Sequence, residues 1–213
     1  MCGRFSLVEA MHDLQAYYQF EMREDFLYTP SRNLAPSQSA AAVVELNGKR
    51  YPANFRWGLI PPFAKDQRIG YKTFNARSET VSEKPSFKKA FESKRCLIPA
   101  TSFYEWKKSG NEKQPFEIKR RDGDPITFAG LWESWRNGDE LIRSCTILTT
   151  EPNDLMAEIH NRMPVILEHN NFDAWLNPDA KLSSLQQLLK PCAGDLLTAE
   201  QISGERFKKS AGY

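Results

Sequence analysis

The chain has 213 residues, of which 40% are hydrophobic, and its formal net charge at pH 7 is +2. This length can bury one substantial core. The longest apolar stretches, residues 96–100 and 164–167, are far shorter than the ~20 residues of a membrane-spanning helix, which argues against a membrane protein. The N-terminus lacks a basic flank followed by an apolar segment, so we expect no secretory signal and a cytoplasmic location.

The spacing of the cysteines and histidines argues against a metal site. The chain has four widely spaced cysteines and three histidines: Cys2, Cys96, Cys145, Cys192, His12, His160 and His169. No C-x-x-C pair or histidine ligand motif is present. We therefore expect no metal and no cofactor, and thiols that stay reduced.

In chain order, the first expected element is a helix directly behind the N-terminus. Apolar residues follow helical spacing from Leu7 to Tyr18, and Ser6-x-x-Glu9 is typical of a capping box. Strands are expected where β-branched and aromatic residues alternate with Asn-Gly and Asp-Gly turns, at 41–46, 50–57, 114–120, 126–135 and 141–149. Further helices are expected at 85–93, 152–159, 170–176 and 181–189. This order predicts one α+β domain over residues 1–213, with mainly antiparallel, barrel-like β-sheets.

The middle of the chain is basic. Residues 81–121 contain eleven Lys or Arg and five Asp or Glu, an excess of six positive charges. This segment is either a solvated helix face with edge-strand lysines or a surface for a polyanion, and charge alone does not distinguish the two.

The second residue carries the most distinctive chemistry. A small residue after the initiator methionine normally allows Met1 to be removed, which would make Cys2 the N-terminus. An N-terminal cysteine has an amine with a pKa of about 7.7–8.0 next to a thiol near 8.5. An aldehyde can form a Schiff base with the amine, after which the thiol closes a five-membered thiazolidine ring. The alternative is that Cys2 is a buried packing residue without reactivity.

Several separated motifs occur in a recognisable order. They are Met1-Cys2-Gly3-Arg4-Phe5, Asn33-Leu34-Ala35-Pro36, Arg56-Trp57-Gly58-Leu59-Ile60-Pro61, Thr73-Phe74-Asn75-Ala76-Arg77-Ser78-Glu79-Thr80, Arg95-Cys96-Leu97-Ile98-Pro99-Ala100, Ser102-Phe103-Tyr104-Glu105-Trp106-Lys107 and Ile159-His160-Asn161-Arg162-Met163-Pro164-Val165. Together they resemble the SRAP (SOS response-associated peptidase) family over residues 2 to about 177. The resemblance implies β-sheets in a pseudo-barrel with flanking helices, and a groove for single-stranded DNA across the N-terminal cysteine.

The resemblance also implies roles for four catalytic residues. Cys2 would crosslink to the ring-opened aldehyde of an abasic site, and Asn75 would hold the sugar hydroxyl or the α-amine by hydrogen bonds. Glu105 would shuttle protons, and His160 would exchange a proton as the carbinolamine becomes an imine. From the residues alone, Asn75 could instead close a turn, Glu105 could pair with a lysine on its strand, and His160 could end a helix.

Four further residues would bind DNA. Arg4, Arg77 and Arg162 match family positions near the cysteine, where guanidinium groups suit phosphate contacts. Trp106 would stack on a base beside the lesion. The alternatives are surface salt bridges for the arginines and core packing for the tryptophan.

The chain departs from the family pattern in two places. Phe63 stands where many relatives have tryptophan, so stacking there would be weaker. From about Asp195 onward the sequence lacks the family's longer tail, and no role for this end follows from the sequence.

The resulting hypothesis is a monomeric sensor of abasic sites in single-stranded DNA, associated with the nucleoid when it is bound to DNA. It would form a thiazolidine crosslink through Cys2, with a weak lyase activity. The alternatives are a cysteine hydrolase that uses Cys2, His160 and Glu105, and a module that binds single-stranded DNA without covalent chemistry.

Overall fold

The computed structural model describes residues 2–110, 112–204 and 207. Its strands are β1 (Arg4–Leu7), β2 (Ser31–Leu34), β3 (Ser39–Leu46), β4 (Lys49–Trp57), β5 (Asn75–Arg77), β6 (Arg95–Ala100), β7 (Ser102–Ser109), β8 (Glu112–Arg120), β9 (Ile126–Asn137), β10 (Glu140–Thr150), β11 (Met163–Pro164) and β12 (Leu197–Gln201). Its α-helices are α1 (Met11–Tyr18), α2 (Pro85–Ser93), α3 (Asp154–Ala157), α4 (Phe172–Leu176) and α5 (Leu182–Gln187). Short 3-10 turns lie at Gln67–Lys72, Ser78–Thr80, His169–Asn171 and Gly194–Leu196.

One of the two sheets closes into a barrel. Strands β10, β4, β3, β6 and β9 are neighbours in that order, and β9 pairs in turn with β10, which completes the ring. Pairing is antiparallel except where β10 runs parallel to β4 and β5. The expected α+β fold with mainly antiparallel sheets in a pseudo-barrel is confirmed.

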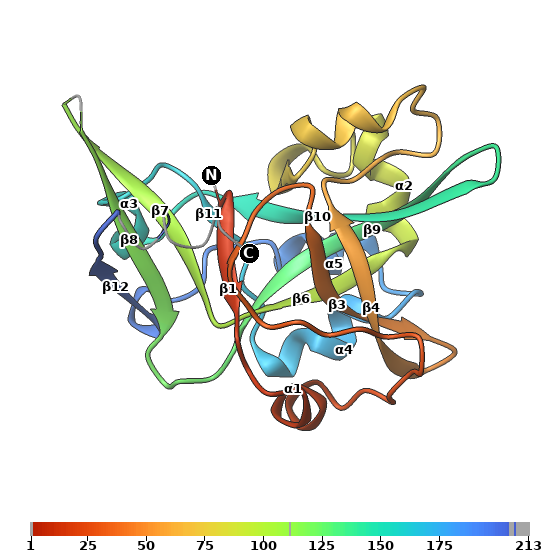
Figure 1. The fold of residues 1–213 in the computed structure, drawn as a ribbon, viewed down its shortest axis with the longest axis horizontal. Coiled ribbons are helices and arrows are strands. Elements are labelled where there is room, and N and C mark those ends of the chain that lie inside the picture. The colour runs from red at the N-terminus through yellow and green to blue at the C-terminus, as the bar shows by residue number, and fades with distance from the viewer. Residues whose placement is uncertain (1, 111, 205–206, 208–213) are drawn as a thin grey trace.

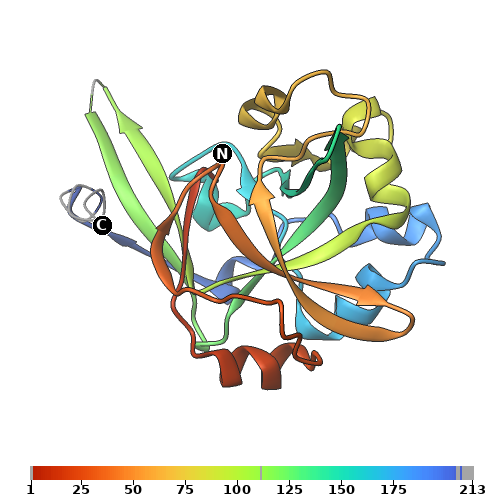
Figure 2. The same ribbon diagram turned by 45° about the vertical axis from the view of Figure 1, so that its right-hand side comes forward.

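The second sheet carries the N-terminus. Its order is β12-β8-β7-β1-β2, so β1 has a hydrogen-bonded neighbour on both sides. In Figure 1 β1 stands between the long β7–β8 hairpin and the barrel, and Figure 2 shows the N-terminus at the top of the space between them. A strand paired on both edges frays much less than a free terminus, so this sheet fixes the start of the chain.

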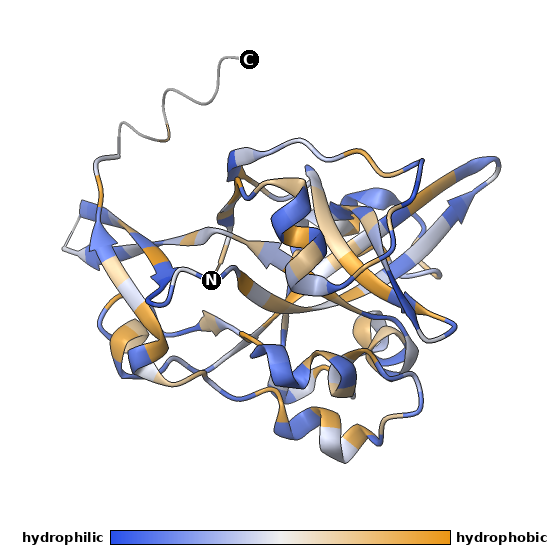
Figure 3. Ribbon diagram, turned by 90° about the horizontal axis from the view of Figure 1, so that it is seen from below, coloured by the Kyte–Doolittle hydropathy of each residue, from blue (hydrophilic) through white to orange (hydrophobic). Residues whose placement is uncertain are grey.

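The core lies between and inside these sheets. Figure 3 shows hydrophobic and hydrophilic stretches alternating along the strands, as expected for strands with one face turned inward. The largest fully buried side chains include Trp57, Phe5, Phe103 and Phe128. Phe5 makes edge contacts with both Trp57 and Phe128, at ring-centroid distances of 5.0 and 5.7 Å. The third residue after Cys2 is therefore a buried aromatic side chain that anchors the start of the chain in the core.

The helix expected directly behind Ser6 begins later than predicted. Ser6 lies in β1, and its Oγ is 2.7 Å from Oγ of Ser102 instead of capping a helix. Helix α1 begins at Met11, and its N-cap residue Ala10 makes no side-chain capping bond. The capping-box interpretation was wrong because strand pairing with β2 and β7 satisfies the backbone at this point.

The other expected elements match closely. Helix α2 has the predicted bounds, while α3, α4 and α5 are shorter than expected. The five expected strands correspond to β3, β4, β8, β9 and β10. No helix in the described ranges is long and apolar enough to cross a membrane.

Candidate active site around Cys2

Cys2 lies at the entrance to β1 and is completely buried. Its Sγ is 3.8 Å from the carbonyl oxygen of Arg4 and donates a weak hydrogen bond to it. Burial raises the pKa of the Cys2 thiol well above its ordinary value, and the carboxylate of Glu105 raises it further. The thiol is therefore protonated at neutral pH.

Asn75 joins Cys2 to the barrel. It lies on β5, which pairs in parallel with β10, and its Nδ2 donates a 2.7 Å hydrogen bond to the carbonyl oxygen of Cys2. The Oδ1 of Asn75 is buried and has no hydrogen-bond partner in the part of the chain that the structure describes. The site thus contains one amide acceptor whose hydrogen-bonding capacity is unused.

Glu105 supplies a buried carboxyl group. It lies on β7, pairs with Phe116 across the β7–β8 hairpin and is 3% exposed. Its negative charge raises the pKa of the Cys2 thiol and opposes the lowering of the pKa of His160. The structure therefore brings Glu105 within electrostatic reach of both predicted partners, because such effects weaken with distance.

His160 follows α3 and is held in one tautomer. Its backbone N–H donates to the carbonyl of Met156, and its Nδ1 accepts the backbone N–H of Arg162 at 3.0 Å. Because Nδ1 is an acceptor, the proton of the neutral ring lies on Nε2. Burial lowers the pKa of His160 below 6.5, against the opposing effect of Glu105. At pH 7 this histidine is a neutral Nε2–H donor.

The three predicted DNA-binding arginines differ in how they are held. Arg162 makes a two-point salt bridge to Glu79, at 2.5 and 2.9 Å, and its Nη2 also donates to the carbonyl of Thr149 at 2.6 Å. Arg4 donates from Nη1 to Oδ1 of Asn33 at 2.6 Å. Arg77 is exposed on β5. Among the three, Arg77 is the one whose side chain is most open to an external phosphate.

Trp106 is half-buried on β7 and packs against Phe207, with ring centroids 5.2 Å apart. Trp106 thus packs against one ring and keeps part of its surface exposed.

Sequence reasoning did not identify two supporting groups. The first is a buried polar network in which Oγ of Ser102 donates to Oε1 of Glu117 at 2.8 Å and contacts Ser6 on the other side. The second is Asn33, whose contact with Arg4 fixes that guanidinium. Asn33 and Ser102 each lie in a motif of the sequence, Asn-Leu-Ala-Pro and Ser-Phe-Tyr-Glu-Trp-Lys, which could have pointed to them, whereas Glu117 lies in no such motif.

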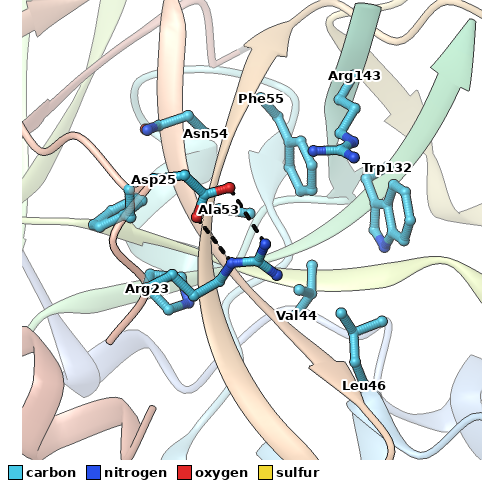
Figure 4. Close-up of a pocket in the computed structure, with 11 residues that line it drawn as sticks. Arg23, Asp25, Val44, Leu46, Ala53, Asn54, Phe55, Trp132 and Arg143 are labelled. Atoms are coloured by element: carbon cyan, nitrogen blue, oxygen red, sulfur yellow. Dashed lines mark hydrogen bonds and ion pairs between the residues drawn. The ribbon is translucent and has the colours of Figure 1, made fainter. Parts of the chain in front are cut away.

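A separate cavity of about 240 Å³ lies between β4, β9 and β10, away from Cys2 (Figure 4). We call it the Trp132 cavity, and it is lined by Arg23, Asp25, Phe26, Val44, Leu46, Pro52, Ala53, Asn54, Phe55, Trp132 and Arg143. The rings of Phe55 and Trp132 stack at 5.4 Å with an interplanar angle of 8°. None of the eight predicted site residues lines it. Within the described ranges, no group of three or more His, Cys, Asp or Glu side chains could hold a metal ion.

Comparison with known proteins gives the family. The model of the family described as "SOS response associated peptidase (SRAP)" matches residues 1–206. The chain belongs to the SRAP family, in agreement with the resemblance of its motifs.

Individual relatives are similar along nearly the whole chain. The abasic site processing protein YoaM of Bacillus subtilis is 46% identical over 209 residues, which cover 95% of this chain and 91% of YoaM. The abasic site processing protein YedK of Escherichia coli is 27% identical, covering 100% of this chain and 94% of its own length. A crystal structure of a Bacteroides thetaiotaomicron protein superimposes with a TM-score of 0.92 at 28% identity, covering 100% of this chain and 97% of that one.

Proposed function

We propose that this protein captures abasic sites in single-stranded DNA by forming a covalent thiazolidine crosslink through Cys2 after Met1 has been removed. Relatives of similar length carry the name abasic site processing protein. The observation that carries the proposal is the hydrogen bond from Asn75 to the carbonyl of Cys2, which holds the second residue of the chain beside a buried carboxyl group and a neutral histidine. Residue 1 lies outside the described residues, so removal of Met1 stays a prediction.

The proposed reaction needs no cofactor and proceeds in three steps. The amine of Cys2 adds to the aldehyde carbon of the ring-opened sugar and forms a carbinolamine. Loss of one water gives an imine. The Cys2 sulfur then bonds to the imine carbon and its proton passes to the nitrogen, which closes the thiazolidine ring. Because the thiol is already adjacent to the imine, ring closure has the advantage of an intramolecular reaction.

The side chains around Cys2 suit these proton transfers. The imidazolium form of His160, which the nearby Glu105 favours, can protonate the departing hydroxyl of the carbinolamine, and Glu105 can accept a proton during sugar opening or amine attack. The free Oδ1 of Asn75 can accept a hydrogen bond from the sugar hydroxyl or the amine. Arg4, Arg77 and Arg162 would contact phosphates, and Trp106 a neighbouring base.

The resulting crosslink would shield the lesion as part of the response to DNA damage. Schiff-base chemistry at an abasic site can also cleave the strand by β-elimination, so a weak lyase activity is expected before the ring closes. Ring closure suppresses it because the imine is consumed.

The environment of the Cys2 thiol does not favour a cysteine hydrolase. A hydrolase needs a thiolate, and reactive cysteines have a lowered pKa. At Cys2, burial and Glu105 raise the pKa of the thiol and outweigh the N-terminal ammonium, which lowers it. We therefore assign the first attack to the amine and the ring closure to the thiol.

The test compares wild type with Cys2→Ser on single-stranded DNA that carries one abasic site. Wild type should give a crosslink that survives heating in SDS. Cys2→Ser keeps a small second residue and thus an N-terminal amine, so it should give a crosslink only when borohydride reduces the imine. Mass spectrometry of both proteins verifies that Met1 is absent.

Two results would contradict the proposal. A heat-stable crosslink of equal yield in Cys2→Ser would show that the thiol is not required. No crosslink in wild type lacking Met1 would leave a hydrolase, tested with peptide substrates, or non-covalent DNA binding, tested by anisotropy.

A further inference from the structure

The C-terminal Phe207 packs on the same side chains to which the proposed function gives DNA contacts. Its ring lies 4.9 Å from the ring of Tyr104 in an edge arrangement and 5.2 Å from that of Trp106. The guanidinium carbon of Arg4 lies 5.9 Å from the centroid of the Phe207 ring. One aromatic side chain thus engages both the predicted stacking residue and one predicted phosphate-binding arginine.

The pairing of strand β12 positions Phe207 beside these side chains. Strand β12 pairs antiparallel with β8 at the edge of the five-stranded sheet, and the backbone N–H of Ile202 then bonds to the carbonyl of Pro115 at 3.0 Å. Pro115 stands opposite Trp106 in the β7–β8 register. The chain therefore leaves the sheet beside Trp106, five residues before Phe207.

A base and Phe207 would use the same surface. The aromatic contact and the cation–π contact that Phe207 makes are the two interactions that an unpaired base would make with Trp106 and Arg4. A base stacked on Trp106 at this place needs the volume that the Phe207 ring occupies.

We propose that Phe207 is an internal competitor of DNA, which covers Trp106 and Arg4 in the free protein and is displaced by an unpaired base next to the lesion. This inference rests on the proposed function and adds a form of regulation to that site. Strands that offer a stackable base can displace the ring, whereas strands without one leave it in place. The competitor thereby lowers the affinity that base stacking contributes and keeps Trp106 and Arg4 covered when no unpaired base is present.

The experiment measures binding separately from chemistry. A fluorescent single strand carries a tetrahydrofuran in place of the abasic sugar, which has no aldehyde and forms no crosslink, and anisotropy gives its Kd. Phe207→Ala should bind about tenfold more tightly than wild type, since one aromatic pair and one cation–π contact no longer compete. Leu182→Ala, which truncates an apolar side chain that is 40% exposed on α5, is the matched control and should bind as wild type does.

A second strand tests the mechanism of displacement. When both bases that flank the tetrahydrofuran are also removed, Phe207→Ala should lose more affinity than wild type, because in wild type displacement of the ring offsets part of the free energy that base stacking contributes. Equal or weaker binding of Phe207→Ala to the first strand would overturn the proposal and make Phe207 a residue without effect on binding or a DNA contact.

Crosslinking to true abasic DNA distinguishes the two proposals. If wild type crosslinks but Phe207→Ala binds no more tightly, only the proposal that Phe207 competes with DNA is wrong. If neither protein crosslinks, the proposed function is wrong.

Discussion

The molecule has two regions of different character, the site around Cys2 and the Trp132 cavity. The Trp132 cavity has a volume of about 240 Å³, a stacked aromatic pair and an exposed ion pair in which Arg23 donates to Asp25 at 3.0 Å. The site around Cys2 holds a buried thiol, a buried carboxyl group and a histidine with a lowered pKa. Buried titratable groups with mutual influence mark chemistry better than volume does.

Removal of the Cys2 thiol should give the largest difference in crosslinking between variants of the two regions. Cys2→Ala should abolish the heat-stable crosslink, because no sulfur remains to close the ring. Trp132→Ala, which truncates the aromatic wall of the other cavity, should crosslink at the wild-type rate per folded molecule. A denaturing gel measures crosslinking by both variants. Loss of crosslinking in folded Trp132→Ala would contradict the expectation that only the site around Cys2 is needed for the reaction.

Glu105→Gln should give the next largest effect. The amide has nearly the same shape but cannot exchange a proton, so the crosslinking rate should fall about 100-fold, within the usual range for general acid–base catalysis. Single-turnover kinetics on the gel measure the rate. A change in DNA affinity at an unaltered rate would instead make Glu105 a binding residue.

Asn75 and Asn54, one in each region, provide a matched pair of alanine variants. Asn75→Ala removes the hydrogen bond to the carbonyl of Cys2 and should slow crosslinking about tenfold through lost positioning. Asn54→Ala removes a comparable 2.9 Å bond, from its Nδ2 to the carbonyl of Leu27 beside the Trp132 cavity, and should not change the rate. Similar rates for both variants would argue against a positioning role for Asn75.

The smallest expected effect is the contribution of His160 to the pH dependence of stability. Its pKa is lowered in the folded state, so below pH 6.5 the unfolded chain binds more protons at this residue than the folded protein does. Stability should therefore fall as the pH drops through 6.5 towards the lowered pKa. His160→Asn keeps an acceptor for the N–H of Arg162 but does not titrate, and should lose less stability than wild type between pH 7.5 and 5.

Urea unfolding at the two pH values measures this effect. Comparison of the two proteins cancels the contributions of His12 and His169, which both contain. An equal loss of stability in both proteins would show that His160 does not have a lowered pKa.

The sequence predicted the parts of the fold that depend on local patterns. Alternating β-branched residues located β9 and β10, and the region with helical spacing and a proline at its start located α2 with its true bounds. It misplaced the start of α1, because the partners of Ser6 lie on distant strands and leave no local signal. Strand pairing between distant segments overrides a nearby capping pattern.

For the candidate site, the family motifs predicted residues that the structure brings near Cys2, but not their contacts. The sequence did not predict that Glu79 and Thr149 already occupy the guanidinium of Arg162. It also gave no role to the segment after Asp195, because the pairing of β12 with β8 and the contact of Phe207 with Trp106 depend on partners about 80 to 100 residues away. Long-range contacts of this kind need the folded structure.

The bond between Ser6 and Ser102 spans 96 residues, and under the proposed function this separation determines when the protein can become reactive. On the ribosome, the nascent chain exposes its first residues long before β7, with Glu105, and the loop with His160 have been synthesised. Under the proposed function, a newly made N-terminal cysteine would therefore have an ordinary thiol and amine, without the carboxyl group and imidazole that are proposed to speed its reaction with aldehydes. The distance along the chain would delay the proposed chemistry until about three quarters of the polypeptide has emerged and the five-stranded sheet can assemble.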